Sequence, residues 1–158
     1  MNSTYLKNLR TVYFAMAMGI VLFMLVTYFV NSINGPLAET DIAPAQRTPF
    51  MIALLVLTGA IFMIYRAVFP KKLEAIKALP TLSRKLAAWR ELSFLHAALI
   101  EAPAFFAIVL FLLLGVFTLL IWPVAGIFLF WLQQPTRAKL IREANLSSAE
   151  IAEFDSMN

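Results

Sequence analysis

One glutamate lies inside a long apolar region of this sequence. Glu101 follows His96 by five positions and precedes Pro103, within a stretch that is almost wholly apolar from about residue 92 to residue 132. A carboxyl group in such surroundings is costly, and it normally faces protein or water, where it binds an ion, moves a proton or makes a hydrogen bond. Glu101 is therefore the first candidate for chemistry in this chain, as an ion-binding residue.

Few polar side chains are available to complete a site with Glu101. Thr58 lies at the middle of the second apolar segment, and His96 precedes Glu101 in its own segment. Five helical steps separate the side chains of His96 and Glu101 by about 140°, so a direct relay between them within one helix is not expected. Glu101 has a second interpretation, as a neutral acid that donates a hydrogen bond between helices. Small residues that let helices approach closely are expected at Ala15, Gly19, Gly59, Ala98 and Ala102.

Most catalytic chemistry lacks its residues here. The chain has no cysteine and one histidine, which argues against thiol catalysis and against metal sites built from these ligands. Phosphate-binding loops, nucleophile elbows and dinucleotide fingerprints do not occur. We expect no catalytic residue, no metal and no cofactor, and we interpret the protein as a non-enzyme.

The composition predicts a membrane protein. Of 158 residues, 61% are hydrophobic and 14% are charged, far from the roughly 25% charged residues of soluble domains. Four segments are apolar over about the length that spans a bilayer. We predict an all-α, polytopic domain over residues 1–158, with spans at about 12–30, 49–69, 92–114 and 117–132 and a short helical tail over 133–158. Gly115 is the expected break between the last two spans, and Pro123 is expected to kink the fourth.

The basic residues predict the orientation. Twelve of the 13 lysines and arginines lie in the N-terminal segment, in residues 66–90 or in the C-terminal tail, whereas the loop between the first two spans contains only Arg47. Cytoplasmic loops carry an excess of lysine and arginine. We therefore expect both termini in the cytoplasm and a bacterial inner (cytoplasmic) membrane. The same rule explains the net charge of +4 without nucleic acid.

Two extramembrane segments show helical signals. Pro70 and Pro80 are expected to bracket a short basic amphipathic helix, and Thr81 is expected to cap the next one. Residues 71–90 are interpreted either as an interfacial segment or as a docking surface for anionic lipid or a partner. In the tail, Ser147 and Glu150 form a capping-box pattern with Leu146 and Ile151 as its hydrophobic staple.

Two resemblances concern the second half of the chain. The stretches ALIEAPAFFAIVLFLLLG and QQPTRAKLIREANLSSAE resemble a group of small four-helix bacterial membrane proteins, from which no activity can be transferred. The Glu101 helix is also similar to the carboxylate helix of the proteolipid c subunit of rotary ATP synthases. That resemblance implies that Glu101 carries a proton or a cation, although this chain has fewer glycines and a longer connector.

The sequence thus favours a non-enzymatic subunit or accessory factor of an inner-membrane complex, assembled as a homo-oligomer or within a larger assembly. The alternative is a proton- or cation-handling element that uses Glu101 at mid-membrane.

Overall fold

A computed structural model describes residues 4–37 and 44–157 of the chain, and all the regular structure there is helical. The elements are α1 (Thr4–Asn34), α2 (Pro44–Lys77), α3 (Leu82–Leu114), the 3₁₀ helix η1 (Phe117–Leu120), α4 (Ile121–Leu132), α5 (Arg137–Ala144) and α6 (Ser148–Ser156). Within the described residues, α1, α2 and α3 are long and apolar enough to cross a membrane. The segment 117–132 joined to α5, with a bend of 81°, gives a fourth candidate span. The predicted all-α class is confirmed, and the long helices have the length and the apolar composition that a membrane span requires.

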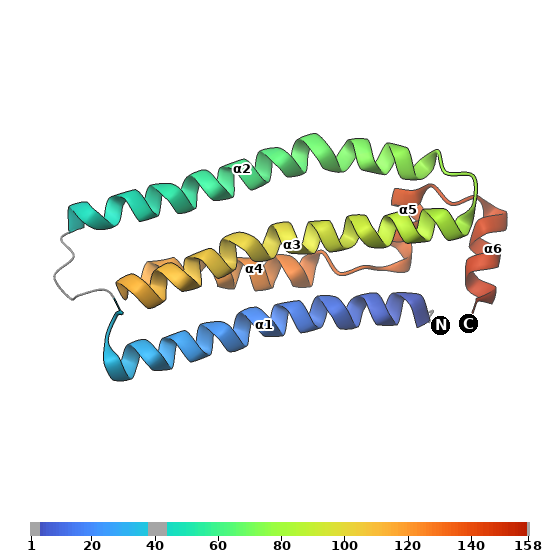
Figure 1. Cartoon of the computed structure of the whole chain (residues 1–158). Helices are drawn as coiled ribbons and strands as arrows, with labels where there is room; N and C mark the ends of the chain where they lie inside the picture. Colours follow the sequence, from blue (N-terminus) through green and yellow to red (C-terminus); the bar gives the residue numbers. More distant parts are fainter. Residues whose placement is uncertain (1–3, 38–43, 158) are drawn as a thin grey trace.

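The helix α3 is the centre of the bundle. α1, α2 and α4 all pack against it, and α1 also packs against α4 (Figure 1). The hydroxyl of Tyr13 donates to the carbonyl of Ser93 at 2.7 Å, and the amide of Asn31 donates to the carbonyl of Phe111 at 2.7 Å. Both bonds join residues 80 positions apart, so α1 and α3 run parallel in a constant register. Both ends of the chain lie at the same end of the bundle (Figure 1).

Gly115 ends α3 as the sequence predicts. Its φ of +66° is left-handed, and its N–H donates to the carbonyl of Phe111 at 2.8 Å. Glycine reaches this conformation without the steric cost that a Cβ adds. A Cβ at this position would also lie 2.9 Å from Cγ of Pro36, so Gly115 lets the loop after α1 pack closely against the end of α3.

Two prolines act differently from the expectation. Pro70 does not begin a separate helix, because α2 continues through it to Lys77. The proline removes only one backbone donor, and the helix is otherwise uninterrupted there. Pro123 lies in the first turn of α4, where a missing N–H costs little, and the irregularity falls just before it, in η1.

The two short C-terminal helices pack against the shared end of α1, α2 and α3, and we call α5 and α6 together the terminal cap. The capping box of Ser147 and Glu150 is confirmed: the Ser147 hydroxyl accepts from the Glu150 N–H, and the Glu150 carboxylate accepts from the Ser147 N–H at 2.8 Å. The interior of this region is an apolar cluster of residues from five helices and the loop at 145–147, among them Leu6, Leu9, Ile76, Leu82, Leu86, Trp89, Leu140, Ala144, Leu146 and Phe154. Distant parts of the chain therefore meet in one small core.

One ion pair connects the terminal cap to α3. Nζ of Lys85 lies 2.8 Å from the Glu150 carboxylate, and the Lys85 side chain is only 8% exposed. The hydrogen bond from Lys85 lowers the pKa of Glu150 below its usual range, and the Ser147 N–H acts in the same direction. Lys85 is therefore a structural residue rather than part of the exposed basic surface expected over 71–90.

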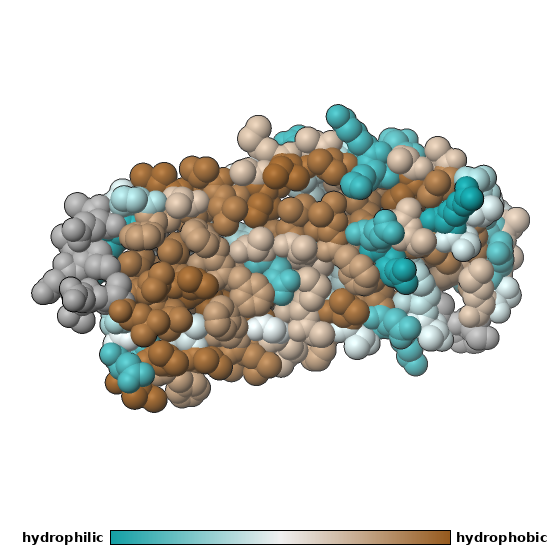
Figure 2. All heavy atoms as spheres, viewed as in Figure 1, coloured by the Kyte–Doolittle hydropathy of each residue, from teal (hydrophilic) through white to brown (hydrophobic). Residues whose placement is uncertain are grey.

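Hydropathy divides the surface along the bundle. Brown, apolar residues dominate the half of the bundle away from the terminal cap, and teal residues gather mainly toward the end with the terminal cap (Figure 2). On α2 the exposed apolar side chains include Ile52, Leu55, Val56, Phe62, Met63 and Ile64. Such an apolar band matches the hydrocarbon region of a bilayer.

Candidate functional site

Glu101 lies on the side of α3 that borders α1. It is half-exposed, between the buried Ala97 and Ala104 along its helix. The register of 80 positions places Glu101 at the level of Val21, where α1 offers only apolar side chains. Within the described residues, the carboxyl of Glu101 makes no hydrogen bond. The second interpretation of Glu101, a hydrogen bond to another helix, is thus not met within the described part of its own chain.

The two expected polar partners lie on another side of α3. His96 is about 140° away from Glu101 around the helix, and its ring stacks on Tyr65 of α2 with centroids 4.9 Å apart. The Thr58 hydroxyl donates to the carbonyl of Leu54 and accepts from Nε1 of Trp122 at 3.1 Å. α3 therefore separates Glu101 from α2, and neither Thr58 nor His96 contributes to a site with it.

The small residues expected between helices lie mostly at the surface of the bundle. Ala15, Ala98, Ala102 and Gly59 are exposed, and a Cβ added at Gly19 or Gly59 would meet nothing within 4 Å. The close contact within the bundle instead joins α3 to α4. A Cβ at Gly126 would lie 3.3 Å from Cβ of Ala104. The spacing of small residues in a sequence does not show which face of a helix packs against which neighbour. It therefore did not identify the pair of Gly126 and Ala104.

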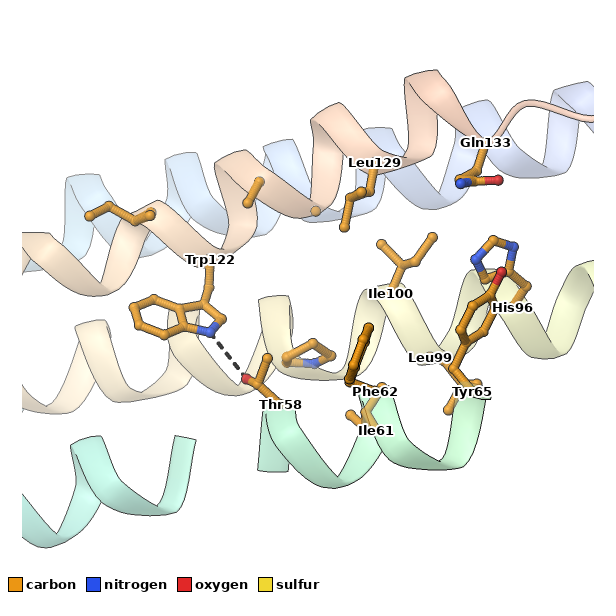
Figure 3. Close-up of a pocket in the computed structure, with 14 residues that line it drawn as sticks. Thr58, Ile61, Phe62, Tyr65, His96, Leu99, Ile100, Trp122, Leu129 and Gln133 are labelled. Carbon is orange, nitrogen blue, oxygen red and sulfur yellow. Dashed lines mark hydrogen bonds between the residues drawn. The ribbon is translucent and has the colours of Figure 1, made fainter. Parts of the chain in front are cut away.

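A second feature is an apolar groove formed by α2, α3 and α4, with a volume of about 420 Å³. Its floor is α3, and its walls come from α2 and α4 (Figure 3). The lining residues Phe62, Ile121, Ala125 and Leu129 are exposed, so the groove opens sideways to the surface of the bundle. Its volume and its apolar walls with a few polar groups are typical of small-molecule sites.

Polar groups lie at both ends of the groove. The hydrogen-bonded pair of Trp122 and Thr58 closes one end, and Tyr65, His96 and Gln133 gather at the other (Figure 3). His96 and Gln133 also line a smaller, adjoining pocket with Lys139 and Glu143. Nζ of Lys139 donates to Oε1 of Gln133 at 2.8 Å. The groove thus passes from an apolar channel to a polar end next to the terminal cap.

Sequence reasoning missed three residues of this groove. Tyr65, Trp122 and Gln133 are not among the candidate site residues that the sequence indicates. A weak signal exists, because Gln133 directly follows α4 and could be expected at an interface. Nothing in a single sequence, however, indicates that α2 and α4 lie over the same face of α3.

No three His, Asp or Glu side chains within residues 4–37 and 44–157 gather in a way that could hold a metal ion. Compared with protein-family models, curated proteins and solved structures, the chain shows no significant match in any of the three. The two resemblances described above therefore remain interpretations of the sequence.

Proposed function

We propose that this chain is a non-catalytic subunit or accessory factor of a complex in the bacterial inner membrane, and that it contacts another membrane helix through the Glu101 surface of α3. The Glu101 surface consists of Glu101 with the exposed residues Ala98 and Ala102. The observation that carries the proposal is a half-exposed carboxyl without a hydrogen bond in the described part of its own chain, beside two small residues.

The physical argument concerns the cost of a carboxyl in hydrocarbon. A charged side chain at the centre of a membrane helix costs roughly 2.5–3.5 kcal/mol on insertion scales, and the neutral acid still needs a hydrogen-bond partner. Small residues let a second helix approach closely, and a polar side chain then bonds across the interface. A helix from another subunit or from a second copy supplies this partner, since α1 offers none at the level of Glu101.

Photo-cross-linking tests the contact. A photoreactive residue in place of Ala102 is expected to give a discrete protein adduct in native membranes, either with a second copy or with another subunit. The matched control is Ala60, which is exposed on α2 and lies away from the Glu101 surface. Protein adducts at Ala102 that do not exceed those at Ala60 would contradict the proposal.

The proposed membrane topology has four spans, with η1 and α4 as the fourth, and both termini in the cytoplasm. It is supported by the distribution of basic residues and by the position of both chain ends at one end of the bundle. The chain has no cysteine, so single thiols can be introduced without background. The thiol of Asp41→Cys, at a position outside the described residues, is expected to react with an impermeant maleimide from the outer side. The thiol of Ser156→Cys is expected to react only after the membrane is opened, and the reverse pattern excludes this topology.

A second candidate function, the handling of a proton or a cation, also depends on Glu101. If Glu101 binds a proton or a cation, its half-exposed position suits a site that a neighbouring subunit completes, as in the proteolipid that its helix resembles. The substitution that separates the two functions is argued in the Discussion.

A further inference from the structure

We propose that the groove between α2, α3 and α4 binds one acyl chain of an anionic phospholipid, with the lipid headgroup at the end formed by Tyr65, His96 and Gln133. This inference depends on the proposed membrane placement and is independent of any contact at the Glu101 surface. It assigns a ligand to a part of the molecule that the proposed function does not use.

The shape of the groove suits a lipid chain that enters from the side. α2 and α4 both pack on α3, and a hydrogen bond between Trp122 and Thr58 joins them at one end. Between that end and Gln133 the groove is apolar and open to the surface. At 1.5 Å per residue it extends about 18 Å along α4, from Ile121 to Gln133, and about 10 Å along α2, from Thr58 to Tyr65. It therefore accommodates part of an acyl chain within one bilayer leaflet.

The polar end offers three groups that can donate hydrogen bonds. The Tyr65 hydroxyl and the His96 ring make no hydrogen bond within the described residues, and the Gln133 amide uses its oxygen for Lys139, which leaves its NH₂ group available. His96 is only 7% exposed. Its ring nitrogens are nevertheless not fully enclosed. They therefore border open space, in the groove or in the adjoining pocket that the ring also lines. Phosphate oxygens accept several such bonds and carry no competing donor.

The charges around this end select an anionic headgroup. Arg66 directly follows Tyr65, is exposed and lies with its guanidinium 5.8 Å from the ring centroid of Phe62, a groove residue. Lys139 is held beside Gln133, and Glu143 is the one carboxylate that lines the adjoining pocket. Lys139 therefore lies at the headgroup end, and Arg66 is the next basic side chain, one residue beyond Tyr65 on α2. Each basic residue near a membrane surface favours an anionic lipid by about fivefold.

Native mass spectrometry of the whole protein, released from detergent, tests the proposal with three probes. These are phosphatidylglycerol, phosphatidylcholine of the same chain length, and a neutral isoprenoid quinone. We expect one equivalent of phosphatidylglycerol to be retained at least fivefold more than phosphatidylcholine. The substitution Arg66→Gln is expected to lower this preference about fivefold.

Two matched variants locate the binding site. Ala125→Phe fills the groove from an exposed position and is expected to abolish the single retained lipid, and Ala125→Leu is expected to weaken its retention. Ala60→Phe adds the same ring to an exposed position of α2 outside the groove and is expected to leave retention unchanged. Circular dichroism confirms that each variant keeps its helical content.

Three outcomes would overturn the proposal. Equal retention of the two phospholipids would refute the role of headgroup charge, and retention that survives Ala125→Phe would refute the groove as the site. Retention of the quinone but not of phosphatidylglycerol would assign the groove to another ligand. A chain that stays in the aqueous fraction without detergent would instead refute the membrane placement, and so the two failures are distinguishable.

Discussion

Replacement of Trp89 by alanine is expected to release the terminal cap from α3, with a loss of about 3–5 kcal/mol in the free energy that holds it. Trp89 is 1% exposed and belongs to the apolar cluster with Leu140 and Phe154. Its ring centroid lies 6.5 Å from that of Tyr5, and its Nε1 donates to the Glu143 carboxylate at 2.8 Å. The substitution leaves a cavity where α1, α3 and the terminal cap meet.

Hydrogen exchange in detergent micelles measures this loss locally. Amides of α5 and α6 are expected to exchange faster by about two to four orders of magnitude, as roughly 1.4 kcal/mol corresponds to a factor of ten. Trp89→Phe retains most of the ring and loses the bond to Glu143, so a smaller effect of about 1–3 kcal/mol is expected. Trp131→Ala is the matched control, because that side chain is 67% exposed. Equal exchange rates in Trp89→Ala and Trp131→Ala would show that the cluster does not hold the terminal cap.

The helices were predictable because their signals are local. Apolar length predicted the first three long helices, and the left-handed preference of glycine predicted the end of α3 at Gly115. The capping box needs only residues Ser147 to Glu150, and it formed as predicted. Thr81 does occupy the N-cap of α3, but its side chain makes no capping bond there.

The faces of the helices were not predictable, since they depend on contacts between distant segments. Lys85 looks like one more exposed basic residue of the connector until α6 places Glu150 beside it, 65 positions later. Ala98 and Ala102 have the spacing of a packing pair, yet the rotation of α3 turns them outward. The same rotation directs His96 toward α2 and Glu101 toward α1. A period of 3.6 residues defines which residues share a face, but not which neighbour that face meets.

The substitution Glu101→Gln is expected to give opposite results under the two proposed functions. Glutamine keeps the shape of the side chain and a hydrogen-bond donor, but it cannot load or release a proton. If Glu101 makes a hydrogen bond to a helix of another subunit, recovery of the complex is expected to stay within about twofold of the wild type. Glu101→Leu, which removes the bond, is expected to weaken association about threefold to 18-fold, because such bonds contribute roughly 0.6–1.7 kcal/mol.

Glu91→Gln is the matched control for both substitutions. Glu91 is an exposed carboxylate in the first third of α3, about 15 Å from Glu101 along the helix axis at 1.5 Å per residue. It is expected to change neither the recovery of the complex nor ion flux. A loss of assembly in Glu91→Gln equal to that in Glu101→Leu would show a general sensitivity of α3 to lost charge, not a specific contact of Glu101.

Loss of ion flux in Glu101→Gln, with the complex recovered intact, would reject the accessory function and establish ion handling. Proton or sodium flux into vesicles that contain the purified complex measures this directly. Carbodiimide gives an independent readout, since it modifies protonated carboxyls in apolar surroundings. Labelling that is confined to Glu101 and stops flux supports an ion carrier, whereas labelling that disrupts assembly and leaves flux unchanged supports a contact between subunits. Because the neutral acid is the cheaper form in hydrocarbon, labelling of the isolated chain is expected under both functions, and only its consequence distinguishes them.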